Sequence, residues 1–199
     1  IAGVSEGERD FFGTQQAADF IHSVSQEYDY PLFINADHTY SVERAHEALD
    51  AGYDMVIIDG AEKPYDENVA MTKEVVTYRD AIDSHAIIEA ELGYIGGGSN
   101  IKDELPEGVS EETMTKPAEA AQFVATTGVD ALAPSVGNVH GMIKSGNPKL
   151  DPQRVADVRG AAGVPLVLHG GSGSADDDFI RVIEAGISAV HISTEIRKA

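Results

Sequence analysis

The stretch PLFINADHTYSVERAHEALDAGYDMVIIDG, residues 31–60, contains the pattern of a strand, a helix and a second strand. Two apolar runs, PLFINA at 31–36 and DMVIID at 54–59, flank SVERAHEALDAG, in which apolar residues recur at helical spacing. Both runs are short and almost continuously hydrophobic, which is typical of strands buried on both faces of a parallel sheet. The stretch therefore predicts a right-handed βαβ unit.

The same alternation continues along the chain on both sides of this unit. Apolar runs predict strands at 1–5, 31–36, 54–59, 85–90, 130–135, 164–169 and 188–193. Helical spacing predicts helices within 14–28, 41–52, 67–81, 116–128, 151–163 and 175–186. Ser41 and Asp151 are expected helix N-caps, and several helices end in glycine. A doubly wound sheet and a (β/α)₈ barrel both fit this order.

The polar residues favour the barrel. Nearly every predicted strand ends in a polar or charged residue that is not needed for packing of the core. These groups are Ser5, Asp37 with His38, Asp59, Glu89 with Glu91, His140, His169, and Ser193 with Thr194. In a barrel all strand ends meet at one mouth, whereas an open sheet spreads them along an edge. We therefore expect an α/β protein with a TIM (β/α)₈ barrel, with about seven of the eight strands present in a single partial domain over residues 1–199. The first βα unit and the C-terminal helices are expected to lie outside this sequence.

Composition and charge exclude several classes of protein. The 199 residues are 42% hydrophobic and include no cysteine, so thiolate metal sites and disulfides are excluded. The balance of 14 Lys and Arg against 34 Asp and Glu gives a net charge of −20, which argues against nucleic acid as a partner. No apolar run approaches the roughly 20 residues that span a bilayer. We expect a cytoplasmic protein that neither crosses nor binds a membrane.

Three histidines stand at predicted strand ends or in a short loop after one, namely His38, His140 and His169. Three neutral imidazoles leave one position of a tetrahedral zinc ion open for substrate or water. A single histidine there is more often a hydrogen-bonded or surface residue, but three at one rim beside carboxylates favour a metal site.

Carboxylates accompany the histidines. Asp37 can act as a general acid or base if His38 lies past the end of its strand, although a turn or cap role is also open. Glu89 and Glu91 share a strand face, so one can bind a metal and the other can support it. Asp59 fits an accessory metal position and an ordinary turn equally well.

A glycine-rich turn, HGGSG at 169–173, follows one predicted strand and precedes a helix. Its backbone N–H groups can surround an anion, and Ser172 can add a hydroxyl. Ser193 and Thr194 end the neighbouring strand beside this turn. Phosphate bound by the last two strand loops is a recurring arrangement in TIM barrels.

Several motifs together resemble one family over essentially the whole chain. ADHTYSVERAHEALDAGYDMVIIDG, IEAELGYIGG, VGNVHGMIKSGNPKLD, VPLVLHGGSG and GISAVHISTEI occur in the order and spacing of that family. The sequence resembles the class II, metal-dependent fructose-bisphosphate aldolases and their tagatose-bisphosphate relatives. No lysine lies within an apolar strand, which agrees with a mechanism that needs no Schiff base.

The resemblance implies a role for each matching residue. It implies that His38, His140 and His169 hold a catalytic zinc ion, with Glu91 and Asp59 as further metal positions, and that Asp37 protonates the aldehyde oxygen. It implies that the substrate contacts Ser5, Gly141, Lys144, Gly170, Ser172, His191, Ser193 and Thr194. It also implies a monovalent cation, Na⁺ or K⁺, on backbone carbonyls near HGG, and a homodimer or higher homo-oligomer for the full-length protein.

Three features of the sequence depart from the family pattern. His191 stands where the family usually has an asparagine that binds the enediolate. The loop GSNIKDELPEGVSEE offers Asp103, Glu104 and Glu107 as the proton-abstracting base without choosing among them. Ala61 and Glu62 replace the serine and histidine of many tagatose-type members.

The expected function is a zinc-dependent lyase of carbohydrate metabolism, in glycolysis and gluconeogenesis. It reversibly cleaves a ketose 1,6-bisphosphate, fructose 1,6-bisphosphate first, into dihydroxyacetone phosphate and glyceraldehyde 3-phosphate through a zinc-stabilised enediolate. The alternatives are a tagatose-bisphosphate or other sugar-phosphate aldolase, and a metal and sugar-phosphate binding protein without catalysis. We expect the isolated segment to be unstable or inactive, because a barrel that lacks a strand leaves sheet edges unpaired.

Overall fold

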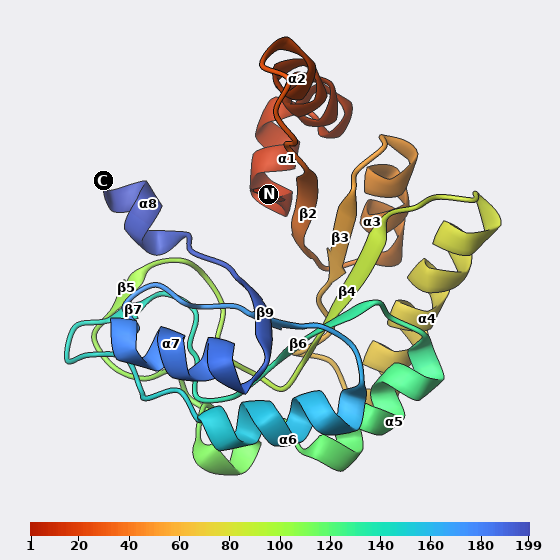
Figure 1. Cartoon of the computed structure of the whole chain (residues 1–199). Helices are drawn as coiled ribbons and strands as arrows, with labels where there is room; N and C mark the ends of the chain where they lie inside the picture. Colours follow the sequence, from red (N-terminus) through yellow and green to blue (C-terminus); the bar gives the residue numbers. More distant parts are fainter. The chain divides into compact units, whose positions relative to one another are not determined.

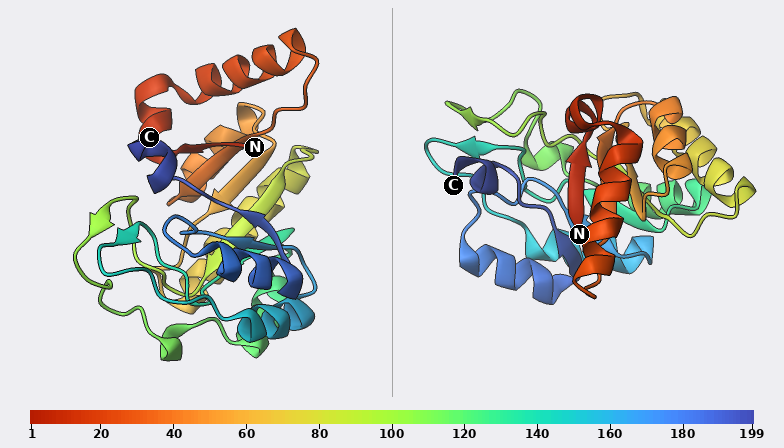
Figure 2. Two further views of the ribbon diagram at one scale, coloured as in Figure 1. Left: turned by 60° about the vertical axis from the view of Figure 1, so that its left-hand side comes forward. Right: turned by 90° about the horizontal axis from the view of Figure 1, so that it is seen from above.

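A computed structural model describes residues 1–199 and confirms the predicted alternation of strands and helices (Figure 1). The chain divides into two compact units, residues 1–91 with 126–130 and residues 92–125 with 131–199. Figure 2 shows the same elements from two further directions.

The first unit contains four parallel strands whose order in space follows the chain. They are β1 (Ala2–Ser5), β2 (Ile34–Thr39), β3 (Met55–Ile58) and β4 (Ile87–Leu92), the last of which ends at the boundary of the unit. Ser5 lies opposite Asp37, and Ile57 lies opposite Glu89. Because the strands are parallel and adjacent, their C-terminal ends lie along one edge, where Ser5, Asp37 and Glu91 are found.

Helices follow the strands of the first unit. They are α1 (Glu6–Phe12), α2 (Thr14–Glu27), α3 (Val42–Asp50) and α4 (Tyr65–Ala81). Alternation along β2 places Ile34 and Ala36 on one face, and α3, which packs against β2 and β3, contributes the buried residues Ala48 and Leu49. The opposite face of β2 carries Asn35 and Asp37, so one strand serves both the packing and the site.

The second unit contains three parallel strands, β6 (Ala131–Pro134), β8 (Leu166–Leu168) and β9 (Ile187–Val190). A separate parallel ladder joins β5 (Ile101–Lys102) to β7 (Met142–Ile143). The helices are α5 (Pro117–Thr127), α6 (Pro152–Ala162), α7 (Asp176–Ala185) and the short α8 (Thr194–Lys198), with a 3₁₀ turn at Glu111–Thr113. Helices α6 and α7 pack side by side. The strands of the two units match the seven that the sequence predicts.

The expected helix caps are present. The side chain of Ser41 accepts a hydrogen bond from the N–H of Arg44 at 3.3 Å, and Asp151 accepts one from Arg154 at 3.0 Å. Gly163 ends α6 in the left-handed region at φ 73°, where a residue with a Cβ is strained. These caps satisfy backbone groups that a helix end leaves without an intrahelical partner.

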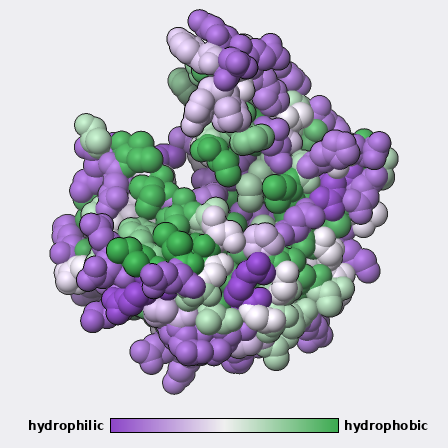
Figure 3. Space-filling model, in the orientation of Figure 1, coloured by the Kyte–Doolittle hydropathy of each residue, from purple (hydrophilic) through white to green (hydrophobic).

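Hydrophilic residues cover much of the face shown in Figure 3, in agreement with the net charge of −20. Apolar residues on that face gather in a few patches. None of the helices is long and hydrophobic enough to cross a bilayer.

Candidate active site

His38 lies at the centre of the polar residues that end the strands of the first unit. Its Nδ1 is 2.8 Å from Oδ2 of Asp59 and 3.8 Å from Oε1 of Glu91, and its Nε2 is 3.9 Å from Oδ1 of Asp37. The four side chains are 3–22% exposed. The structure therefore brings together one predicted metal ligand, two predicted accessory ligands and the predicted acid–base residue.

The backbone of β2 explains how adjacent residues share this site. The regular pairing of β2 with β3 is interrupted between Ala36 and Thr39, and His38 adopts φ 46°, in the left-handed region. Adjacent residues of a regular strand point to opposite faces, so this irregularity is what turns His38 toward the carboxylates. The sequence left open whether the strand ends before His38, and the structure answers with a distorted strand that continues to Thr39.

Asp59 forms the turn that the sequence allowed and also contacts a predicted metal ligand, His38. Its Oδ1 accepts a hydrogen bond from the N–H of Ala61 at 3.1 Å, as in an Asx turn, while its Oδ2 pairs with His38. The N–H of Asp59 donates to the carbonyl of Thr39 at 2.8 Å, which fixes the end of β3 beside the end of β2.

The carboxylates create a strongly negative environment. Burial by itself lowers the pKa of His38, but the hydrogen bond to Asp59 and the charges of Glu91, Asp37 and Asp59 outweigh it and raise the pKa to about 9. Burial and then the charge of Asp59 hold the pKa of Glu91 well above its usual range, against the opposing effect of His38. Burial, followed by the same carboxylates, raises the pKa of Tyr40 to about 12. A cation relieves this crowding of negative charge, so the donor set fits a divalent metal.

Three histidines lie close together in the second unit. The ring centroids of His140 and His169 are 5.9 Å apart, and those of His169 and His191 are 4.3 Å apart. Nδ1 of His140 is 2.6 Å from the carbonyl oxygen of Gly96, and this contact is satisfied when Nδ1 carries the proton. The lone pair of the neutral ring is then on Nε2, the usual arrangement for a histidine that binds a metal. His169 is buried.

The glycine-rich turn is held tightly in its shape. Gly170 has φ 63°, and a Cβ on it would lie 2.3 Å from the carbonyl oxygen of Val139. Gly141 has φ 86°, and its Cβ would lie 2.2 Å from the carbonyl oxygen of Asn100. Both predicted phosphate-loop positions therefore require glycine.

Internal bonds already engage part of this turn. The N–H of Gly171 donates to the carbonyl of His191 at 3.3 Å, and the N–H of Gly173 donates to Oε1 of Glu195 at 2.9 Å. The buried Oγ of Ser172 accepts from the N–H of Ser193 at 3.3 Å. Thr194 is buried and donates to the carbonyl of Ser99 at 3.2 Å. The predicted residues 170–173 and 193–194 thus form one connected loop pair.

Ser5 and Lys144, two further predicted substrate residues, each contact an acidic side chain. The hydroxyl of Ser5 donates to Glu8 at 2.7 Å, so Ser5 holds the start of α1 and lies at the edge of the site. The ladder of β5 with β7 brings Lys144 into an ion pair with Asp103, and both side chains are well exposed. Asp103 is therefore the one candidate for the base that pairs with a predicted substrate residue. The other two candidates, Glu104 and Glu107, are exposed.

Sequence reasoning missed Asn147. Its Nδ2 donates to the carbonyls of Gly141 at 3.3 Å and Ser172 at 2.8 Å, and its Oδ1 accepts from the N–H of Ile143 at 2.7 Å. Asn147 therefore ties the loop of His140 to the glycine-rich turn. The sequence signal was the GN pair at 146–147, which also predicts an ordinary turn.

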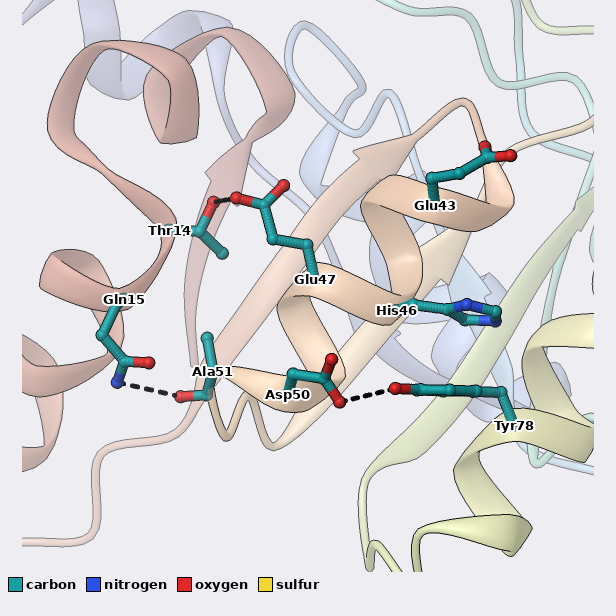
Figure 4. A pocket seen from close by; sticks show the side chains of 8 residues that line it. All are labelled: Thr14, Gln15, Glu43, His46, Glu47, Asp50, Ala51 and Tyr78. Atoms are coloured by element: carbon teal, nitrogen blue, oxygen red, sulfur yellow. Dashed lines mark hydrogen bonds between the residues drawn. The ribbon is translucent and has the colours of Figure 1, made fainter.

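A surface pocket on the helix side of the first unit contains none of the predicted site residues (Figure 4). The hydroxyl of Thr14 donates to Glu47 at 2.9 Å, that of Tyr78 donates to Asp50 at 2.8 Å, and His46 stacks on Tyr78. Because these side chains largely pair with one another, we place the chemistry at the strand ends.

The parallel strands, the alternating helices and the polar strand ends define an α/β protein of the TIM-barrel type, with a site rich in histidine and carboxylate. A sequence profile described as fructose-bisphosphate aldolase class-II matches residues 1–199. The fructose-bisphosphate aldolases of Staphylococcus aureus strains Mu50 (ATCC 700699) and MW2 are each 37% identical over 198 residues, which are 98% of this chain and 66% of the relative.

Solved structures agree with the sequence comparison. The YdjI aldolase from Escherichia coli K12 matches with a TM-score of 0.82 and 32% identity, over 98% of this chain and 66% of that one. A putative fructose-1,6-biphosphate aldolase from Coccidioides immitis matches with a TM-score of 0.76 and 30% identity, over 97% and 65%. The chain belongs to the class-II fructose-bisphosphate aldolase family, and it spans 66% of the length of these S. aureus relatives. The predicted family and the partial TIM barrel are confirmed.

Proposed function

We propose that this chain carries the active site of a metal-dependent aldolase that reversibly cleaves fructose 1,6-bisphosphate into dihydroxyacetone phosphate and glyceraldehyde 3-phosphate. The observation that carries the proposal is the His38 group, in which Asp37, Asp59 and Glu91 surround one imidazole at the strand ends. Family membership supports the reaction type. An aldol cleavage needs a group that stabilises negative charge on oxygen and residues that move protons.

We infer that His38, His140 and His169 hold one zinc ion, with Glu91 and Asp59 as accessory ligands. The contacts of His38 with Asp59 and of His140 with Gly96 are of the kind that orient a ligating imidazole. Bound there, zinc supplies a Lewis acid that offsets negative charge developing on the substrate oxygens. A monovalent cation near the HGG turn stays a prediction.

The residues of the chain supply binding and proton transfer. Gly141, Gly170, Ser172, Ser193 and Thr194 bind the phosphate of the dihydroxyacetone phosphate half, with Lys144 adding a positive charge. Ser5 contacts the other end of the substrate. Asp37 exchanges a proton with the aldehyde oxygen, and an acid of the 103–107 loop removes the carbon-bound proton. His191, whose ring lies 4.3 Å from that of His169, donates a hydrogen bond to the dihydroxyacetone phosphate half of the substrate.

His191 also supports a second candidate within the same reaction class. An imidazole in place of an asparagine amide has a different reach and donor geometry, so it changes which substrate hydroxyls are accepted. The second candidate is therefore an aldolase for tagatose 1,6-bisphosphate or another phosphorylated ketose. A metal and sugar-phosphate binding protein without catalysis is the third.

One set of assays separates the three candidates. Dihydroxyacetone phosphate release is measured by a coupled assay on fructose and tagatose bisphosphates, with and without a chelator, for the full-length protein and for its Asp37→Asn and His85→Ala variants. Chelation and Asp37→Asn are expected to abolish release, while His85→Ala, an exposed control outside the site, leaves it unchanged. Release that resists the chelator contradicts the metal mechanism. Zinc binding without release on either sugar supports the third candidate.

We propose that the full-length protein works as a homodimer or higher homo-oligomer in the cytoplasm, in glycolysis and gluconeogenesis. Light scattering on the purified protein tests the oligomer, and a strictly monomeric active species contradicts it.

A further inference from the structure

Arg9 is the one buried side chain among the lysines and arginines of this chain, at 1% exposure. It belongs to α1, which follows β1 directly. Placing a guanidinium in the interior is costly unless its donors are satisfied by nearby acceptors. The location of those acceptors therefore indicates what the residue does.

The two terminal nitrogens of Arg9 reach β1 and the end of β2, whereas the buried Nε has no hydrogen-bond partner. One terminal nitrogen donates to the carbonyl of Val4 at 2.6 Å and lies 3.5 Å from the carbonyl of Asp37. The other donates to Oγ1 of Thr39 at 2.9 Å, and Thr39 is fully buried. Glu6 is the nearest carboxylate in an ion pair, at 4.0 Å. The guanidinium is thus bound mainly by backbone carbonyls and a hydroxyl.

These contacts enclose the strained residue of the site. Asp37 precedes His38 and Thr39 follows it, so Arg9 contacts the chain on both sides of the residue at φ 46°. A non-glycine residue in the left-handed region costs of order 1–3 kcal/mol and persists only where its surroundings determine it. The contacts of Arg9 meet this requirement together with the N–H of Asp59, which donates to the carbonyl of Thr39 at 2.8 Å, and the hydroxyl of Thr39, which donates to the carbonyl of Ala36 at 3.4 Å.

We propose that Arg9 is a positioning residue that holds the Asp37–Thr39 turn in the distorted shape that presents Asp37 and His38 to the site. The effect of Arg9 on the shape of this turn does not depend on what the protein does. Its consequence for catalysis rests on the proposed aldolase function. Arginine suits the task because its planar fork donates in fixed directions to acceptors on two strands, whereas lysine provides one ammonium.

The variants isolate the contact from general destabilisation. Arg9→Lys keeps the charge and loses the fork, and Thr39→Val removes the hydroxyl acceptor with little change in shape. Arg44→Lys is the matched control, because Arg44 lies in the same unit and pairs with Asp10 and Glu47 away from the turn. Thermal unfolding of each protein establishes that it is folded at the assay temperature. If Arg9→Lys fails to fold, Thr39→Val carries the test.

The first readout needs no activity. In the metal-free protein, the His38 ring N–H bonded to Asp59 is expected to give a downfield, slowly exchanging proton NMR signal. Arg9→Lys and Thr39→Val are expected to shift or lose this signal, and Arg44→Lys is expected to keep it. An unchanged His38 signal in folded Arg9→Lys and Thr39→Val overturns the proposal, whether or not the protein proves to be an aldolase.

The second readout concerns catalysis. Residues that orient metal ligands typically change metal affinity or activity by about 10- to 100-fold, so Arg9→Lys is expected to lower kcat by about tenfold or more, with KM within about threefold. Cobalt(II) affinity, followed by its visible absorption, is expected to weaken in parallel. A parent protein that is inactive on every sugar phosphate contradicts the proposed function alone. An active parent with unchanged kcat and cobalt affinity in Arg9→Lys overturns the positioning role.

Discussion

The backbone angle φ of His38 determines how the adjacent side chains of Asp37 and His38 are oriented. Alternation along β2 places Asp37 on the face opposite to its neighbours, and the φ of 46° at the next residue turns the imidazole toward Asp59 and Glu91. The sequence predicted both residues for the site from their place after an apolar run. It could not show the turn, because nothing in ADHT requires a left-handed histidine, nor could it show the buried arginine beneath.

The positive φ of Gly170 predicts a loss of stability when this residue is replaced. Gly170→Ala is expected to destabilise the fold by more than about 1 kcal/mol, because of its positive φ and the close approach of the Val139 carbonyl. Gly160→Ala is the control, since Gly160 lies within α6 with no atom within 4 Å of its added Cβ. It is expected to stabilise the fold by about 0.5–1 kcal/mol. Urea unfolding measures both, and equal effects of the two changes contradict the described turn.

The pKa shifts predict how the stability of the metal-free protein depends on pH. The pKa of His38 rises from 6.5 to about 9 in the folded state, so its protonation stabilises the fold fully below pH 6.5 and this contribution is lost as the pH rises through about 9. The raised pKa of Glu91 acts in the same direction. In EDTA, the free energy of unfolding is expected to fall between pH 6.5 and 9.5, by at most about 3 kcal/mol from His38. His38→Asn is expected to flatten this slope, and an identical slope in the variant contradicts the shift.

At the scale of elements, periodicity located the strands and six of the helices to within a few residues. Helix α1 was missed because EGERDFF follows β1 directly and carries charges at positions that a buried helix face normally fills with apolar residues. Strands β5 and β7 were missed because a two-residue ladder has no periodicity to detect. They matter for the site, because this ladder brings the acidic loop beside Lys144.

Asp151, the N-cap of α6, tests whether a helix cap predicted from the sequence contributes measurably to the free energy of unfolding. Asp151→Ala removes the acceptor of the Arg154 N–H and is expected to lower the free energy of unfolding by about 1 kcal/mol. Asp151→Asn, which keeps an acceptor oxygen, is the matched variant and is expected to lose much less. Chemical denaturation of both compares them, and equal losses indicate that the carboxylate acts through charge and not as a cap.

At the scale of the whole molecule, the net charge of the chain opposes binding of the proposed substrate. A net charge of −20 repels a doubly phosphorylated sugar, yet the predicted site contains backbone N–H groups, hydroxyls and histidines at the strand ends. The sequence predicted this solution from HGGSG and the strand-end histidines. It could not predict the internal bonds of the glycine turn, because these depend on Asn147 and Glu195, which lie outside the motif.

The same charge predicts a response to salt. Self-repulsion among the 34 acidic residues destabilises the compact state, and added salt shortens the Debye length from about 30 Å at 0.01 M to about 10 Å at 0.1 M. The melting temperature is therefore expected to rise between 0.01 and about 0.3 M NaCl. KCl at equal ionic strength is the control, and a melting temperature that falls with both salts contradicts the repulsion argument.

The bridge from Asn147 to the Gly141 and Ser172 carbonyls has a thermodynamic consequence for ligand binding. Loops that order themselves around a ligand lose conformational freedom at the moment of association, and this loss weakens affinity. Here the amide of Asn147 holds the turn before any anion arrives, so that loss accompanies folding instead. Phosphate binding should then show a small unfavourable entropy, with association limited by encounter and not by rearrangement.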